Sequence, residues 1–508
     1  MRDLKYIQDK YFIGYNDTDP PENLPEGYCA MIQNAFTRTG EIVKRTGYTI
    51  IGNDLGSTAI QGLRGVRFAN GTQELIMVTN GTTYKWTGSG NWSALTGTYT
   101  LDTTGFVDIV VANNSLYFFD GTNTPAKYNG TTMSTVAAIP VGSFARWFHN
   151  QLHVAGISGS PNTLRSSDIG DPEVFTGANS SNLNVNPNDG DEITGLIELK
   201  NELLVFKKNR VWSMTGFGTA ALDLADLNER LTGFGTLSHF SLVNTGKDVL
   251  YVGFLGDRPV IRSIETTRFG TVLDAGIVSK DIEVTMDGLN KARLNQSAGL
   301  FDGRYAWFSF CNGASTTNNL VVTYDTAGVQ TPKGTKRGWM RHTGVNAAIF
   351  ETFVISATPQ LYFGEATADS KVYRFDTATS DNGATIAFSV TTRRYSGQNG
   401  DIKKKFKWLY IWAEETGNFD VTIDKSFDGF TYDNLGTLNL AGSGSTLGSL
   451  ILDTSRLGST DVRINRFSFV KSRNRYLQLQ FYETTATASV NLRNWQIYYI
   501  DKKVPTSI

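Results

Sequence analysis

The sequence predicts an all-β fold: a β-propeller of six or seven blades with an extended N-terminal arm and a C-terminal β-sandwich. Three observations lead to this prediction. The composition is rich in aromatic residues (12%) and glycine (51 residues) and holds only 19% charged residues, which is typical of strands joined by tight turns. One hairpin pattern recurs through the middle of the chain, and the pattern changes after about residue 380. A chain of 508 residues also exceeds one ordinary compact core.

Residues 1–55 are predicted to form the arm and its docking strands. This segment holds Pro20, Pro21 and Pro25 before it settles into two short strand-like runs. Proline fixes its own φ and has no amide hydrogen to give to a strand ladder. We therefore expect an extended segment that docks on the protein's own sandwich or on a neighbouring subunit.

Residues 56–380 are predicted to form the propeller. An alternating apolar run, a Gly, Asn or Asp turn and a second run recur at intervals of about 35 to 55 residues, the spacing of four-stranded blades. A sheet that is apolar on both faces buries both only by packing between neighbours around an axis. The one helical pattern in this region is short, near 220–231. The copies start at Gln73, Asn114, Asn150, Asn201, Asp248, Gly303 and Pro359.

Residues 381–508 have longer strand-like runs and are predicted to form the sandwich. In "KFKWLYIWAE", the aromatic residues Phe406, Trp408, Tyr410 and Trp412 share one face by period-two counting. We expect this aromatic layer to face the second sheet. The basic run 403–405 that precedes it is interpreted as a solvated strand edge rather than a contact with phosphate or a partner.

Charge and cysteine content exclude several classes of protein. Lys and Arg number 47 against 48 Asp and Glu, so the chain as a whole has no electrostatic signature of nucleic-acid binding. Cys29 and Cys311 cannot form a disulfide framework. The sequence shows neither a secretion signal nor an apolar run of about 18 residues, so we expect synthesis in the cytoplasm and no membrane insertion.

The stretch "RSSDIGDPEVF", residues 165–175, is the first candidate site. Asp168 and Asp171 are three residues apart, with Gly170 and Pro172 beside them. A catalytic carboxylate pair is one interpretation, and the start of an Asp box of sialidase propellers is another, although its closing aromatic residue is missing. The residue types favour a structural turn between two strands of a blade.

The stretch "NVNPNDGDE", which starts at Asn184, is the second candidate site. Its asparagines alternate as in a calcium loop, but Gly190 comes one place late and Gly195 stands where a bidentate Glu belongs. We therefore predict a solvated turn and no metal. Its acidic end, with Asp189, Asp191 and Glu192, is a candidate for an acidic loop that lines a lumen.

Sequence motifs of catalysis are missing. Neither a phosphate-binding loop nor a nucleophile elbow occurs, and the close pair His149 and His153 has no third metal ligand nearby. We predict that the chain is not an enzyme, and we assign no catalytic, cofactor-binding or metal-binding residue.

Three stretches, taken in order, carry a resemblance to a known family. They are "CAMIQNAFTRTGEIVKRTGY" from Cys29, "LRSSDIGDPEVF" from Leu164 and "DGDEITGLIELKNELLVFKKNRVWSMTG" from Asp189. In order and spacing they resemble the β-propeller tail proteins of short-tailed bacteriophages, called tail nozzle, tail tubular B or packaged-DNA stabilisation proteins. The similarity extends over roughly residues 28–345.

The resemblance implies a structural protein of the virion tail or neck, made in the host cytoplasm. Such a protein forms a homo-oligomeric, hexameric ring below the portal and adaptor of the head-tail connection, and meets tail fibres or tail tip proteins. Its channel holds packaged double-stranded DNA and conducts it during ejection without sequence-specific contact. A near-neutral chain suits this role, because each Lys or Arg contact with phosphate would retard the DNA.

Two alternatives stay open at this stage. One is a carbohydrate-binding or glycosidase β-propeller, such as a receptor-binding protein, and the other is a scaffold propeller that binds peptides. The sequence leaves open the host, the ring stoichiometry and the blade count. It also leaves open which loops line the channel, and whether the N-terminal strands close the propeller or join the sandwich.

Overall fold

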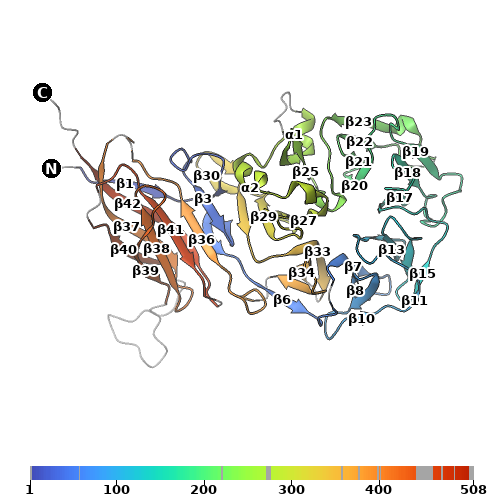
Figure 1. The fold of residues 1–508 in the computed structure, drawn as a ribbon, viewed down its shortest axis with the longest axis horizontal. Coiled ribbons are helices and arrows are strands. Elements are labelled where there is room, and N and C mark those ends of the chain that lie inside the picture. The colour runs from blue at the N-terminus through green and yellow to red at the C-terminus, as the bar shows by residue number, and fades with distance from the viewer. Residues whose placement is uncertain are drawn as a thin grey trace.

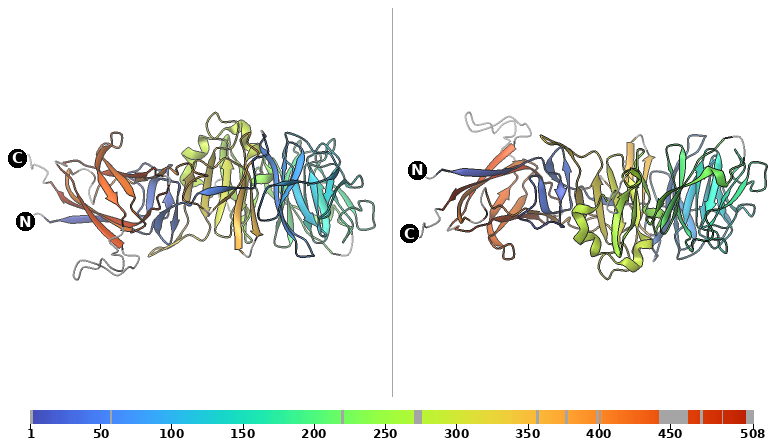
Figure 2. Two further views of the ribbon diagram at one scale, coloured as in Figure 1. Left: turned by 90° about the horizontal axis from the view of Figure 1, so that it is seen from below. Right: turned by 90° about the horizontal axis from the view of Figure 1, so that it is seen from above.

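The protein is elongated, with a ring of small sheets at one end and a pair of larger sheets at the other (Figures 1 and 2). The computed structural model describes residues 3–56, 58–218, 221–269, 276–355, 358–375, 378–397, 400, 402–441, 462–470, 473–485 and 487–502. Almost all regular structure is β, which confirms the predicted all-β class. The chain visits the sheets of the ring in sequence order, as in a propeller.

The first half of the ring consists of antiparallel sheets built from consecutive strands. The first holds β7 (Ile60–Arg67), β8 (Gln73–Thr79), β9 (Thr82–Trp86) and β10 (Ser93–Ala94). The second holds β12 (Asp108–Ala112), β13 (Ser115–Phe119), β14 (Ala126–Tyr128) and β15 (Met133–Thr135), with the short β11 (Gly97–Thr98) parallel to β15. The third holds β16 (Phe144–Phe148), β17 (Gln151–Ala155), β18 (Thr163–Ser166) and β19 (Ser181–Asn184).

The second half continues in the same order. One sheet holds β20 (Ile193–Leu199), β21 (Glu202–Lys207), β22 (Arg210–Met214) and β23 (Leu227–Thr232), and the next holds β24 (Val243–Asn244), β25 (Val249–Leu255) and β26 (Arg258–Ser263). Then come β27 (Ala298–Phe301), β28 (Tyr305–Phe310), β29 (Leu320–Asp325) and β32 (Trp339–His342), with a side hairpin of β30 (Val329–Thr331) and β31 (Gly334–Lys336). The last ring sheet holds β33 (Ala347–Ile355), β34 (Thr358–Glu365) and β35 (Val372–Phe375).

Helical segments are few and short. They are α1 (Ile264–Phe269), α2 (Glu283–Asp287) and four 3₁₀ turns, η1 (Leu224–Asp226), η2 (His239–Ser241), η3 (Lys280–Ile282) and η4 (Lys291–Gln296). The helical candidate near 220–231 is wrong for its second half, which forms the strand β23. Pairing with β22 overrides the local helical pattern there.

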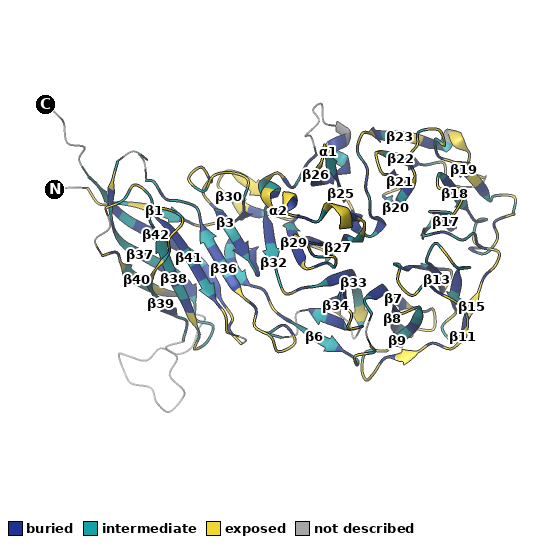
Figure 3. Cartoon of the chain, in the orientation of Figure 1, coloured by how far each residue is buried: buried dark blue, intermediate teal, exposed yellow. Residues whose placement is uncertain are grey.

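Separate hydrophobic clusters join successive sheets of the ring. For example, Ile76 of the first sheet and Phe118 of the second share one cluster, while Tyr117 on the opposite side of the second sheet packs with Leu152 of the third. Figure 3 shows buried residues along the strands and exposed ones mainly in the loops. Each sheet therefore buries both faces against its neighbours, as a closed ring requires.

The N-terminal strands both close the ring and join the C-terminal sheets. The strand β6 (Tyr48–Ile51) pairs with β35 in the last ring sheet, and Ile51 packs with Ile60 of the first sheet. The strands β1 (Lys5–Asp9), β4 (Ala35–Arg38) and β5 (Glu41–Lys44) belong instead to the distal part of the molecule. The sequence left open whether the N-terminal strands close the ring or join the C-terminal sheets, and they do both.

Two larger sheets form the distal end of the molecule. In sheet A, the order is β4, β5, β42 (Asn491–Asp501), β37 (Lys404–Glu414) and β40 (Val462–Ser468), and β1 also pairs with β42. In sheet B, β27, β28, β29 and β32 continue through β2 (Gly14–Tyr15) and β3 (Tyr28–Gln33) into β36 (Phe388–Thr392), β41 (Gln478–Glu483), β38 (Asp420–Ser426) and β39 (Asp433–Asn439). Sheet B therefore runs unbroken from the ring to the far end.

Sheets A and B pack against each other over one core that continues into the ring. Leu409 and Ile411 of β37, Ile423 of β38 and Phe481 of β41 share a cluster with Phe308 of the ring. The rings of Phe481 and Trp495 stack with centroids 5.0 Å apart.

The expected aromatic layer is only partly correct. Phe406 points into the core, but Trp408, Tyr410 and Trp412 lie on the outer face of sheet A and are half-buried. A β-bulge between Phe406 and Trp408, opposite β42, adds one residue and exchanges the two faces of the strand. The basic run matches the expected solvated edge only in part, because Lys403 is exposed but Lys404 is buried.

Buried ion pairs fasten the N-terminal segment to later strands. Lys44 pairs with Glu483, and the exposed fraction of both side chains is 1% or less. Arg45 binds Asp381 through two hydrogen bonds and also donates to the carbonyl of Thr343. Asp9 pairs with Arg393, 2.7 Å apart, and accepts a further bond from the Tyr395 hydroxyl.

We predict that Arg45→Met lowers the free energy of unfolding by about 3 to 5 kcal/mol, because it leaves the buried carboxylate of Asp381 without its partner. Lys5→Met, which breaks a partly exposed pair with Asp501, is the matched control and should change little. Urea unfolding followed by tryptophan fluorescence measures both. Equal changes in the free energy of unfolding of the two variants would show that burial of the Arg45–Asp381 pair does not add to stability.

Candidate functional site

The first candidate, residues 165–175, is a compact turn whose two aspartates accept hydrogen bonds from the turn itself and from Asn179. Asp168 Oδ1 accepts hydrogen bonds from the backbone amide of Ile169 (2.8 Å) and from Asn179 Nδ2 (3.0 Å). Asp171 Oδ1 accepts from the amide of Glu173 at 3.0 Å. Gly170 has a φ of 80°, which favours glycine, and Pro172 is buried. These hydrogen bonds stabilise a turn of the chain, and they leave no pair of carboxylates that faces a cleft.

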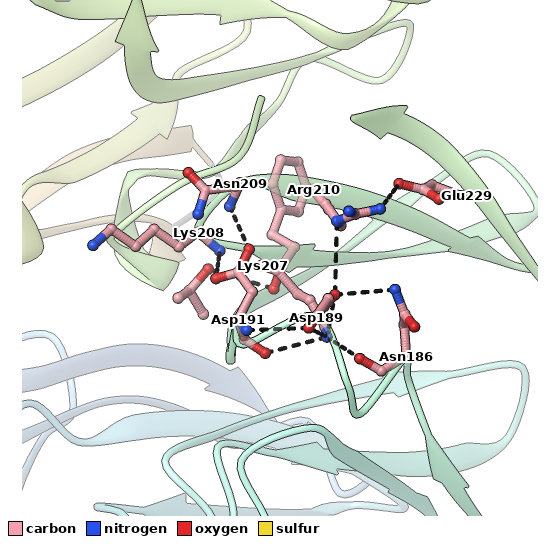
Figure 4. Close-up of polar contacts among 10 residues, drawn as sticks. Asn186, Asp189, Asp191, Lys207, Lys208, Asn209, Arg210 and Glu229 are labelled. Atoms are coloured by element: carbon pink, nitrogen blue, oxygen red, sulfur yellow. Dashed lines mark hydrogen bonds and ion pairs between the residues drawn. The ribbon is translucent and has the colours of Figure 1, made fainter. Parts of the chain in front are cut away.

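The second candidate, residues 184–192, encloses the ammonium group of Lys207 (Figure 4). Lys207 Nζ donates to both carboxylate oxygens of Asp189 at 2.9 Å, to the carbonyl of Asn186 at 3.1 Å and to the carbonyl of Asp191 at 3.2 Å. The Lys207 side chain is fully buried. The oxygen spacing that resembles a calcium loop is thus the spacing of a cage around a lysine.

The carboxylates of this loop are engaged in the fold. Burial acts to raise the pKa of Asp189, but the hydrogen bond from Lys207 and the backbone amide of Asp191 outweigh it, so the pKa lies below its ordinary value. Asp191 accepts from the amides of Lys208 (3.1 Å) and Asn209 (2.7 Å), which ties the loop to the turn between β21 and β22. Two of the three predicted acidic residues are therefore internal.

Glu192 differs from its two neighbours because it is exposed and lines an opening at the ring axis. The opening has a volume of about 800 Å³ and is bounded by the first residues of several innermost strands, including Phe144 and Ile193. Asp120 and His239 share this wall.

An axial cavity of about 430 Å³ lies between the innermost strands of the ring. No local sequence pattern marks this cavity, since its residues come from strands far apart in the chain. Its charged lining consists of Arg64, Asp108, Arg146, Glu198, His239 and Glu351. A concave site with convergent polar groups is the usual place for a ligand.

The carboxylates of this cavity face its two arginines: Asp108 and Glu198 lie beside Arg146, and Glu351 lies beside Arg64. Asp108 accepts from the amide of Ala145 at 2.9 Å and from Arg146 at 3.1 Å. Burial acts to raise the pKa of Asp108, but the positive charge of Arg146, the contact with His239 and the amide of Ala145 together outweigh it and hold the pKa well below the ordinary range. Burial lowers the pKa of His239, whose Nδ1 accepts from the amide of Leu196 at 3.2 Å, so a neutral ring directs Nε2–H towards Asp108, 3.3 Å away.

The opposite wall of the cavity carries Glu351, whose pKa is raised rather than lowered. Burial raises the pKa of Glu351, and Arg64, 3.5 Å away, only partly offsets this effect. Two carboxyl groups whose pKa values are displaced in opposite directions are a pattern found in hydrolases. Here each carboxyl group already has a cationic partner.

The histidines do not form a metal site. The ring of His153 is buried, with Nδ1 2.8 Å from Ser166 Oγ, and burial lowers its pKa to about 4. His149 stacks on Phe217 instead. Within the described parts of the chain, no group of three or more His, Cys, Asp or Glu side chains is placed to hold a metal ion. Among the same residues, no helix is both long and apolar enough to cross a membrane.

Comparisons with known proteins add little. No family model and no curated protein matches the sequence. Among solved structures, YCF48 bound to D1 peptide is 12% identical, with 65% of this chain and 98% of that chain covered and a TM-score of 0.38. The Pan2 WD40 domain of Neurospora crassa is 9% identical, with 66% and 97% covered and a TM-score of 0.39. An exo-beta-1,3-galactanase from Phanerochaete chrysosporium is 11% identical, with 90% and 100% covered and a TM-score of 0.27. Similarities of this size carry no argument about the activity of this chain.

We predict that Lys207→Met lowers the free energy of unfolding by about 3 to 5 kcal/mol, because the buried carboxylate of Asp189 loses its counter-charge. The adjacent Lys208→Met is the matched control, since that side chain is exposed and should change stability by about 0.5 kcal/mol or less. Chemical unfolding of the two variants measures the difference. If both behave alike, the cage around Lys207 does not stabilise the ring.

Proposed function

We propose that this protein is a structural component of a bacteriophage tail or neck, which assembles into a ring that prolongs the portal and adaptor channel. In the virion the ring would retain packaged DNA and conduct it during ejection. The resemblance of the sequence to tail nozzle proteins motivates the proposal. The single observation that supports it best is the unbroken sheet B, which joins the ring of sheets to the distal sheets.

We also infer a blade count and a domain type. The successive ring sheets, counted with the β27 to β32 part of sheet B and with β6 in the last one, would make seven blades. Sheets A and B at the distal end, with their shared core, would make the β-sandwich. The N-terminal segment then belongs to both units.

A rigid body suits a wall subunit better than a hinged binding protein. Two domains joined by a flexible linker move independently, whereas here β2 pairs with β32 and β3, and β3 pairs with both β32 and β36. A neighbouring copy would therefore meet one fixed shape, and repeated identical contacts close a ring only when that shape is fixed. The shape also keeps the channel width constant as DNA passes.

The internal neutralisation of charge fits the same role. In the axial cavity, Asp108 and Glu351 are paired with Arg146 and Arg64, and the loop acids Asp189 and Asp191 are engaged by Lys207 and backbone amides. These groups serve the fold rather than a ligand. The net charge of −1 would let DNA slide past without strong retention.

The second candidate function is a carbohydrate-binding or glycosidase propeller. The opposite pKa shifts of Asp108 and Glu351 in one cavity favour it. The printed activity of the galactanase belongs to that protein, and its similarity is too low to transfer.

We predict that the purified chain, alone or with a portal and adaptor from its own phage, forms closed rings. Negative-stain electron microscopy and mass photometry measure this assembly. Dispersed monomers under both conditions would contradict the proposal.

The carbohydrate alternative predicts glycan binding or glycoside hydrolysis, and the structural proposal predicts neither. We expect the wild-type chain to leave a panel of chromogenic glycosides intact and to give no signal on a glycan array. If the wild type hydrolyses a glycoside and Glu351→Gln abolishes this activity, while the chain still melts like wild type, the carbohydrate function is correct instead.

A further inference from the structure

The outer face of sheet A is an aromatic platform. Tyr6, Tyr498 and Trp408 lie side by side on β1, β42 and β37, since Tyr6 pairs with Tyr498 and Tyr498 pairs with Trp408. Tyr410 and Trp412 continue the platform along β37. The ring of Tyr498 contacts those of Tyr6, Trp408 and Tyr410, with centroids 5.4 to 6.2 Å apart.

Much of this platform is open to solvent. Tyr6 is 59% exposed, and Ile464, which pairs with Trp412 from β40, is 57% exposed. Large aromatic side chains gathered on one solvent-facing surface mark an interaction site.

The platform is also basic. Lys405 precedes the β-bulge on the same face, Lys407 lies at the bulge with its Nζ 6.0 Å from the Trp408 ring centroid, and Arg466 stands exposed beside Tyr410. The acids at the ends of the sheet are already paired, Asp501 with Lys5 and Glu414 with Arg493. The middle of the platform therefore presents positive charge among aromatic rings.

The outer face of sheet B, on the opposite side of the shared core, is acidic. Asp420 and Asp424 of β38 alternate with the buried Val421 and Ile423. Asn434 of β39 shares this face and donates to Asp424, whereas the neighbouring Asp433 pairs with Lys425 on the other side of the strands.

The area is adequate for a stable contact. The strands β37 and β42 have 11 residues each and so are about 37 Å long, and the four strands of the platform are about 15 Å wide. This face supplies most of the roughly 800 Å² that a standard interface takes from each partner.

We propose that the aromatic, basic face of sheet A docks on the acidic face of sheet B of a second copy of this chain. The two faces are complementary in charge and point in opposite directions, so each copy offers one of each. Such head-to-tail contacts generate a ring when the rotation closes. The inference rests on the proposed ring and names the surfaces that would build it.

Charge reversal of either face tests the contact. The variant with Lys405→Glu, Lys407→Glu and Arg466→Glu, and the variant with Asp420→Lys and Asp424→Lys, should each assemble at least about a hundredfold more weakly than wild type. An equimolar mixture of the two should recover assembly, because every reversed face then meets a reversed partner. Mass photometry measures the assembly, and circular dichroism checks that each variant is folded.

The matched control carries the same charge change on the ring: Lys247→Glu, Lys333→Glu and Lys336→Glu, all exposed side chains. It should assemble like wild type. Zero-length cross-linking of the wild-type assembly needs no variant, and should join Lys405 or Lys407 of one copy to Asp420 or Asp424 of another.

Several outcomes would overturn the inference. Variants that assemble like wild type, or cross-links that avoid these residues, would leave the proposed ring standing but place its interface elsewhere. A wild-type chain that binds its adaptor yet never self-associates would remove the second copy as the occupant. Unchanged assembly of Trp408→Ala and Trp412→Ala, together with loss of a glycan-array signal that the wild type gives, would identify a polysaccharide as the occupant.

Discussion

The structure depends on the buried ion pairs that fasten its N-terminal segment. Asp9 with Arg393, Lys44 with Glu483 and Arg45 with Asp381 each join the first 45 residues to strands or loops beyond residue 380. A buried charge that loses its partner is costly, so these contacts define the path of the chain more strictly than apolar packing would. The strand β6 follows directly and completes the last sheet of the ring. One segment thus closes the ring and holds the distal sheets against it.

The ring and the distal sheets act as one body because they share backbone pairing and a core. Sheet B crosses the junction through β2 and β3, and its hydrophobic cluster includes both Phe308 of the ring and Ile423 of the far end. The charged groups inside the ring are also paired. Lys207, Arg146 and Arg64 each face a buried or half-buried carboxylate, so charge inside the ring stabilises the arrangement of strands.

Much of the fold could be predicted from the sequence, but the environment of particular side chains could not. The hairpin pattern predicted the ring of sheets, because alternation and turn residues are local signals. The oxygen-rich loop from Asn184 could be recognised as a cation cage only once Lys207, on another strand, was seen inside it. The outward position of Trp408, Tyr410 and Trp412 depends on a single bulged residue opposite β42, and no local pattern marks it. The axial cavity combines residues from strands throughout the ring, so no local spacing of residues marks it.

The sequence by itself determined the all-β class, the succession of hairpins and the turn at residues 165–175, because each follows from the preferences of neighbouring residues. Only the tertiary structure decided which strand closes the ring, which carboxylates are neutralised and which aromatic residues reach the surface. Those outcomes depend on contacts between residues hundreds of positions apart, such as Arg45 with Asp381 and Tyr6 with Tyr498. The contribution of each charged or aromatic group depends on its burial and on the low dielectric that burial brings. Both are set only once the chain has folded.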